Sequence, residues 1–180
     1  SDYLVGWIDC IKGGAFAGRG IVHSADYLQE GEDARSVDTL SVAAQDLPGR
    51  ILGLFPRSVT WMLMRPFVNN RGMRLVNTMK YWFSRLSRLG ESYLMSHAEF
   101  AFLLDYVPNW KWAYKPGGLI QYQSFIPTQN AMRGFEEILR ISRMAGMPSY
   151  LGVFKKHRPD PFLMTPALDG YSLALDFRVT

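Results

Sequence analysis

The sequence predicts an α+β fold, with a mostly antiparallel β-sheet covered by helices on one face. Two observations support this prediction: short apolar and alternating runs near both ends of the chain, and an amphipathic helix starting near residue 128. The order strand, helix, strand, loop, strand over the last third is typical of such a fold. A length of 180 residues predicts a single domain with one main core.

The first two thirds of the sequence predict a hairpin, a connector and a helix. YLVGWID and GRGIVHSADYL predict a hairpin around a glycine-rich turn, and the polar, acidic residues 29–49 predict a surface connector. The apolar residues between positions 68 and 86 recur at helical spacing, which predicts a helix there. Thr128 is the expected N-cap of the later helix, which ends near Gly146. Its predicted buried stripe consists of Met132, Phe135, Ile138 and Leu139.

Two strands complete the predicted sheet. SYLGVFKKH is the first, a proline-rich loop follows, and YSLALDFRV is the second. The alternation of the last strand places Leu173 and Leu175 on one face and Ser172 and Ala174 on the other. Because this strand runs to the end of the sequence, we expect the chain to be part of a longer polypeptide.

The charges are distributed unevenly. Residues 1–46 hold eight acids and three bases, residues 47–90 hold eight bases and no acid, and residues 91–180 hold nine bases and eight acids. The single Cys10 fits a reducing compartment, and the sequence has no long apolar run and no signal-peptide pattern. We therefore expect a cytoplasmic protein, at most peripheral to a membrane.

Residues 47–90 form a basic aromatic insertion with two interpretations. Arginines interleaved with large apolar side chains suit phospholipid headgroups or a lipid-linked phosphate, and thus peripheral membrane contact. Alternatively, the segment is a helical hairpin with a solvated basic face. The buried side would then comprise Met73, Val76, Met79, Tyr81, Trp82 and Phe83. No nucleic-acid motif accompanies the bases, so we expect no nucleic-acid partner.

Several common kinds of site have no support in the sequence. Gly13, Gly14, Gly18 and Gly20 lack the spacing of a phosphate loop and indicate a turn. The three histidines are far apart in sequence, without partners at metal-ligand spacing, so we expect no metal. No serine or cysteine motif indicates a nucleophile, and no catalytic residue is assigned.

The best functional clue is the strand GLIQYQSFIPT, residues 118–128. Strand alternation puts Gln121 and Gln123 on one face together with Leu119 and Phe125. Two carboxamides among apolar residues need hydrogen-bond partners. They indicate a polar network, a bound ligand or a sheet face wetted by water.

Lys155 and Lys156 lie in another predicted strand, so one side chain points to each face. A lysine that faces inward needs an anion. A bound substrate or a flavin would provide one, and so would Asp176.

A resemblance to a known family is carried by an ordered set of segments. The segments are GWID, AGRG, FLLDYVPNWKWAYKPGGLIQYQSFIP, MPSYLGVFKKHRPDP and DGYSLALDF. Together they resemble the substrate-binding part of the FAD-linked oxidases of the vanillyl-alcohol-oxidase superfamily. The nearest branch oxidises decaprenylphosphoryl-ribose, a lipid-linked sugar phosphate. The resemblance covers residues 6–179, is most specific from Asn109 to Pro127, and is weak between Gln29 and Tyr93.

The resemblance implies a cap or substrate domain that completes a flavin site. FAD would be held mainly by an N-terminal FAD-binding domain of the same polypeptide, absent from these residues, so this chain alone is expected to be inactive. The implied substrate-binding residues are Gln121, Gln123, Lys155, His157 and Ser172, and the implied cofactor-binding residues are Gln123 and Ala174. His157 replaces an aromatic residue of the closest relatives, and Ser172 and Ala174 replace Asn and Cys.

The expected function is therefore that of a flavoprotein. The full-length protein would be an FAD-dependent oxidoreductase that oxidises an alcohol carbon of a small molecule, a sugar or a lipid-linked sugar phosphate. The alternatives are a related flavoprotein, such as a sterol-type reductase or an aldonolactone oxidase, and a noncatalytic module that binds anionic lipid.

Overall fold

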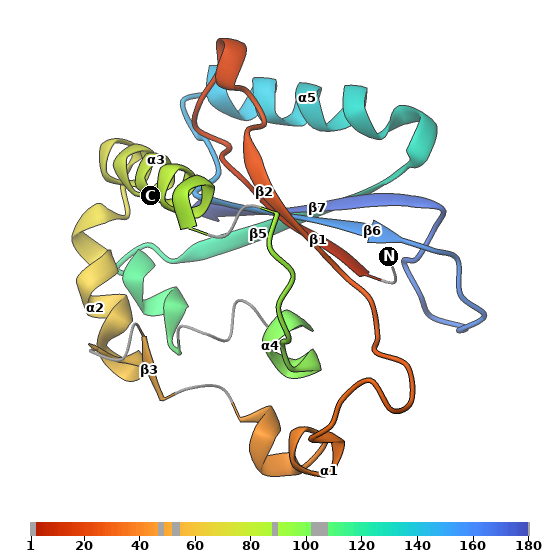
Figure 1. The fold of residues 1–180 in the computed structure, drawn as a ribbon. Helices are drawn as coiled ribbons and strands as arrows, with labels where there is room; N and C mark the ends of the chain where they lie inside the picture. The colour runs from red at the N-terminus through yellow and green to blue at the C-terminus, as the bar shows by residue number, and fades with distance from the viewer. Residues whose placement is uncertain (1–2, 47–48, 52–54, 88–89, 102–107, 180) are drawn as a thin grey trace.

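The fold is an open, fully antiparallel sheet of five strands with helices packed against it (Figure 1). A computed structural model describes residues 3–46, 49–51, 55–87, 90–101 and 108–179. The strand order is β2-β1-β6-β7-β5. The strands are β1 (Tyr3–Ile8), β2 (Gly20–Ala25), β5 (Leu119–Pro127), β6 (Leu151–His157) and β7 (Gly170–Arg178). The predicted α+β class and antiparallel sheet are confirmed.

The predicted N-terminal hairpin is present. β1 and β2 pair from Tyr3 opposite Ala25 to Ile8 opposite Gly20. A Cβ at Gly20 would lie 2.2 Å from the carbonyl oxygen of Trp7, so the close approach of the two strands requires a glycine there.

Helix α5 (Thr128–Met144) covers one face of the sheet. Its buried residues Ala131, Phe135 and Leu139 pack on Leu173 and Leu175 of β7. The helix ends as predicted, because Gly146 takes a positive φ of 71° and the amide of Met147 donates to the carbonyl of Ser142.

Two details predicted for α5 are wrong. Met132 is exposed, because the contact arc runs through Ala131 and Phe135 and turns Met132 toward solvent. The N-cap is Pro127 rather than Thr128, which is the first helical residue. The hydroxyl of Thr128 donates instead to the carbonyl of Asp169 at 3.2 Å, which ties the helix start to the loop before β7.

The connection from β2 to β5 contains short helical segments, one long helix and two short strands that pair with each other. They are α1 (Ser36–Thr39), η2 (Val42–Gln45), β3 (Arg50–Ile51), β4 (Phe55–Pro56), η3 (Arg57–Val59), α2 (Thr60–Met64), η4 (Arg65–Phe67), α3 (Asn70–Ser87), α4 (His97–Ala101) and η5 (Trp110–Tyr114). The remaining short element, η1 (Gly14–Phe16), lies in the first hairpin. A second core joins η5, the loop before α3 and the start of α3 to Tyr150 beside β6. This core lies away from α5 and involves Leu119 at the start of β5.

The predicted helix over 68–86 is confirmed as α3, but its predicted buried side is half wrong. Met73 is buried and Val76 is partly buried, whereas Met79, Trp82 and Phe83 are exposed. The helix carries more apolar residues than one contact stripe needs, so those on the outer arc stay in solvent. Arg88, counted in the basic segment, and residues 102–107 of the resemblance lie outside the described residues.

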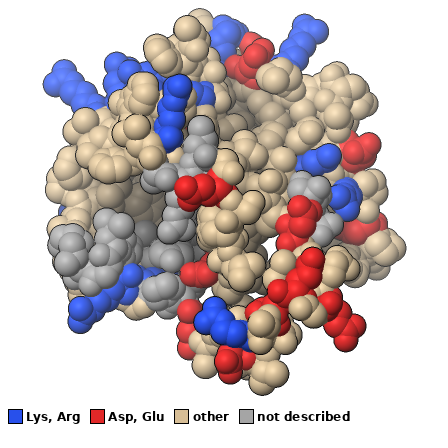
Figure 2. Space-filling model, viewed as in Figure 1, with Lys and Arg blue, Asp and Glu red and all other residues tan. Residues whose placement is uncertain are grey.

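The segregation of charge along the sequence is also visible in space. Figure 2 shows acidic side chains around the lower part of the molecule, where α1 lies in Figure 1, and basic side chains mainly at the upper and left edges. The connector 29–49 is exposed over most of its described length, as predicted for a surface segment.

Candidate functional site

A row of polar side chains crosses three strands on the sheet face opposite α5. We call it the polar row: Gln121, Gln123, Lys155, His157, Ser172 and Asp176. The register places Ser172 of β7 between Phe125 of β5 and Lys155 of β6, and Ala174 between Gln123 and Val153. Because paired residues of antiparallel strands share a face, all these side chains lie on the same side of the sheet.

Ser172 is the centre of one hydrogen-bonded group. Its hydroxyl lies 2.7 Å from Nε2 of His157, and the amide Nε2 of Gln123 donates to the same hydroxyl at 3.5 Å. Ser172 is buried, whereas Gln123 is exposed. With Gln123 as donor to the Ser172 oxygen, the hydroxyl hydrogen is available to His157, whose Nε2 then accepts it.

Gln121 and Asp176 form the second group. The amide Nε2 of Gln121 donates to Oδ1 of Asp176 at 2.9 Å. Burial raises the pKa of the Asp176 carboxyl above its usual range, and the hydrogen bond from Gln121 opposes that shift. Since the amide nitrogens of both glutamines face the sheet, their carbonyl oxygens are the acceptors that remain for a ligand.

Lys155 is exposed beside His157 and Ser172. Asp176 is not its partner, because Asp176 pairs with Leu151, which lies four positions and about 13 Å along β6 from Lys155. Burial lowers the pKa of His157 below its ordinary value, and the positive charge of Lys155 lowers it further. Lys156 points to the other face, opposite Tyr171.

The polar row suits recognition of a hydroxylated ligand. It offers two exposed carboxamides braced by buried partners, one cation and a flanking aromatic ring, since Phe125 and His157 have ring centroids 5.3 Å apart. The side chains of Gln121 and Gln123 are also open to solvent, as the water-wetted interpretation expects. The structure therefore places all the site residues named from the sequence on one open sheet face, in two hydrogen-bonded groups and their neighbours.

Metal binding and thiol chemistry lack support in the described part of the chain. No group of three His, Cys, Asp or Glu side chains there could hold a metal ion. Cys10 is buried, and burial raises the pKa of its thiol to about 12, so a reactive thiolate is disfavoured at neutral pH. No described helix combines the length and the apolar character needed to cross a bilayer.

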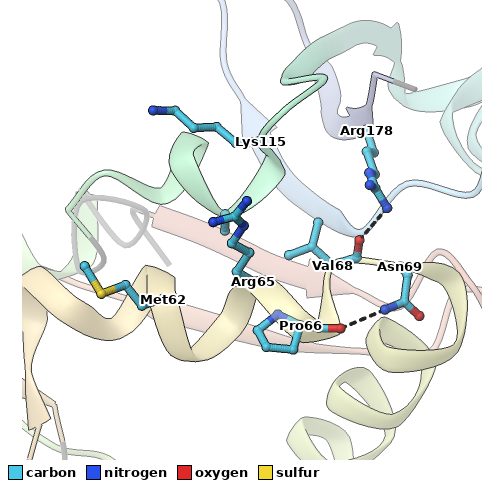
Figure 3. A pocket seen from close by; sticks show the side chains of 8 residues that line it. Met62, Arg65, Pro66, Val68, Asn69, Lys115 and Arg178 are labelled. Atoms are coloured by element: carbon cyan, nitrogen blue, oxygen red, sulfur yellow. Dashed lines mark hydrogen bonds between the residues drawn. The ribbon is translucent and has the colours of Figure 1, made fainter.

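The sequence did not reveal a cationic pocket at the far end of β7. Arg65, Lys115 and Arg178 line a cavity there (Figure 3). These residues come from three segments well separated in the chain, so only the strand order and the second core bring them together. The excess of bases in residues 47–90 was the one available signal, and it identifies only Arg65.

No model of a known protein family matches this chain.

Proposed function

We propose that this chain is the substrate-binding domain of an FAD-dependent oxidoreductase that oxidises an alcohol carbon. The observation that carries the proposal is the group formed by Gln123, Ser172 and His157, which three different strands bring together on an open sheet face. The same positions are those that the resemblance to FAD-linked oxidases assigns to the pocket.

The face fits a flat, hydrogen-bonding group. Ala174 presents only a methyl group between Gln123 and Val153, and Gln123 presents an exposed carboxamide beside it. Gln123 and Ala174 would therefore contact the flavin. When bound, the flavin supplies the acceptor for the hydride of the alcohol carbon.

The residues of this chain bind and orient the substrate. The carbonyl oxygens of Gln121 and Gln123 accept hydrogen bonds from substrate hydroxyls, and Asp176 and Ser172 hold the two amides in place. Lys155 supplies a positive charge for an anionic substrate, such as a lipid-linked sugar phosphate. His157, neutral at pH 7 because of its lowered pKa, closes the row against Phe125.

The proposed partner is an N-terminal FAD-binding domain of the same polypeptide, which would cover the polar row and exclude water. An exposed apolar tip in the β6–β7 loop, at Phe162, Leu163 and Met164, lies near the strand ends that carry His157 and offers a contact for it. A cytoplasmic location is part of the proposal and is supported by the single, unpaired Cys10.

The proposal is tested by replacing Lys155 in the full-length protein. Lys155→Ala should lower turnover strongly and leave FAD content intact, because the lysine contacts substrate rather than flavin. Lys156→Ala is the matched control, since it removes the same charge from the other face of the same strand. Equal turnover in the two variants would contradict the assignment of Lys155 to the substrate site. Screening alcohols, sterols and aldonolactones with the same protein separates the related flavoprotein activities.

One observation favours a second candidate, the noncatalytic anionic-lipid module. The exposed outer arc of α3 repeats at helical spacing and is flanked by the bases Arg71, Arg74 and Arg85. Its apolar members are Leu75, Met79, Trp82, Phe83 and Leu86. Salt-sensitive sedimentation with anionic vesicles, lost in Trp82→Ser, would support this function; sedimentation unchanged by Trp82→Ser would contradict it.

A further inference from the structure

A cavity of about 450 Å³ lies between η4, η5 and the end of β7. Among the described residues, eight line it: Met62, Arg65, Pro66, Val68, Asn69, Ala113, Lys115 and Arg178. This volume falls in the range of small-ligand pockets. Arg178 lies six positions along β7 from Ser172, about 20 Å away, and two positions from Asp176, about 7 Å away on the same face, so the cavity adjoins the Gln121–Asp176 end of the polar row and is remote from Ser172.

The charge of the described lining is positive. Three of the eight described lining residues are cations and none of the eight is an acid. Arg65 has no ion pair with any described residue, and Lys115 lies over the ring of Trp112, with its Nζ 5.0 Å from the ring centroid. A cavity with this lining favours an anion, because unpaired cations gathered in one site repel one another until a counter-charge binds.

Hydrogen bonds fix the part of the cavity wall formed by Arg178, Val68 and Asn69. Nη1 of Arg178 donates to the carbonyl of Val68 at 2.9 Å, whereas its buried Nε has no hydrogen-bond partner among the described residues. Asn69 braces the turn into α3, since its Nδ2 donates to the carbonyl of Pro66 and its Oδ1 accepts from the amide of Gly72. The start of α3 adds the partial positive charge of a helix N-terminus.

Two guanidinium groups and an ammonium group suit a phosphate. Arginine presents several donors in a planar fork that matches phosphate oxygens, and lysine adds a point charge. In Figure 3 the ammonium of Lys115 points away from Arg65 and Arg178. The two guanidinium groups therefore supply the donors for the phosphate, and Lys115 adds positive charge at the edge of the cavity.

The rest of the lining is apolar. It consists of Met62, Pro66, Val68 and Ala113. In Figure 3 Met62 lies on the opposite side of the cavity from Arg178. Met62 is itself exposed, as are its neighbours Leu63 and Phe67. A ligand that fills the cavity would therefore have a phosphate at the arginine end and an apolar part that leaves across Met62.

We infer that this cavity is a phosphate-binding site for an anionic amphiphile, with Arg65 and Arg178 on the phosphate, Lys115 adding positive charge at the edge of the cavity, and Met62 on the apolar part. The site does not depend on the oxidoreductase proposal. The same phosphate chemistry is found in a phospholipid headgroup and in a soluble phosphate ester, and the experiment distinguishes these two sources.

The test measures binding of the purified protein to two probes. The first is phosphatidylcholine vesicles with and without phosphatidylglycerol, and the second is glycerol 3-phosphate. Arg65→Gln and Lys115→Gln should each weaken binding about fivefold, the equivalent of about 1 kcal/mol per basic residue near an anionic surface. Both residues are exposed, so the variants should keep the fold. Arg133→Gln, on the exposed side of α5, makes the same charge change away from the cavity.

The outcomes separate clearly. Binding to phosphatidylglycerol vesicles that Arg65→Gln weakens and Arg133→Gln does not supports the site with a lipid headgroup as ligand. The same pattern with glycerol 3-phosphate alone supports the site with a soluble ester. Equal effects of Arg65→Gln and Arg133→Gln, or no binding of either probe, would overturn it. If Arg85→Gln on α3 weakens vesicle binding while Arg65→Gln does not, the α3 contact stands and the cavity proposal fails.

Discussion

Ser172→Ala is the sharpest perturbation of the polar row, because it removes one hydroxyl on which two side chains converge. Ser172 is 1% exposed and lies 2.7 Å from Nε2 of His157 and 3.5 Å from Nε2 of Gln123. Alanine fits the space that serine leaves, so the change removes hydrogen bonds without opening a cavity.

The expected loss of stability is about 1 kcal/mol. A hydrogen bond of ordinary length contributes roughly 0.5–1.5 kcal/mol net, and the bond to His157 is of that kind. The contact with Gln123 is at the outer limit for a hydrogen bond and contributes little. His157 is only half-buried, so water can replace part of what its ring loses.

Urea unfolding measures this loss. With a slope of about 2 kcal/mol per M, the midpoint should fall by about 0.5 M. Ser24→Ala, on the exposed edge strand β2, is the control and should shift stability by less than about 0.5 kcal/mol. In a protein that already carries His157→Ala, the stability lost in Ser172→Ala should be less than half of the loss in the wild-type background. An unchanged midpoint in Ser172→Ala, or the same cost with and without His157, would refute the hydrogen-bonded row.

Two further predictions concern charge and packing. The pKa of His157, followed by NMR titration, should lie below 6.5 in the wild-type protein and should rise in Lys155→Met. Because the wild-type pKa is lowered on folding, the folded state binds fewer protons than the unfolded state. The contribution of His157 to stability is therefore complete above about pH 6.5 and is lost as the pH falls below that value. An unchanged titration in Lys155→Met would place the lysine away from the ring. Leu175→Ala, at a fully buried position, should lower the free energy of unfolding by about 2–5 kcal/mol. Leu163→Ala, at a fully exposed position, should leave it almost unchanged in thermal or urea unfolding. Similar losses of stability in the two variants would contradict the assigned core.

The sheet was predictable because strand alternation is a local property. The faces assigned to Gln121, Gln123 and Ser172 follow from a period of two, and the structure keeps them. That these side chains meet could not be predicted from the alternation alone. Their meeting depends on β7 lying between β5 and β6, and this order is fixed by long-range pairing that no short segment encodes.

The second core and the cavity were beyond sequence reasoning for a different reason. Helical spacing marks which residues of α3 are apolar, but not which arc meets the sheet, so Trp82 and Phe83 were assigned to the wrong side. Arg65, Lys115 and Arg178 are separated by at least 50 positions in the chain, and only tertiary packing shows that they line one cavity.

The central claim is that this domain serves a flavin enzyme. The most direct test is the visible absorption spectrum of the purified full-length polypeptide, recorded before and after anaerobic addition of sugar and alcohol substrates. The proposal predicts flavin bands that bleach with one class of alcohol. A well-folded, colourless protein that cannot be reconstituted with FAD would contradict it.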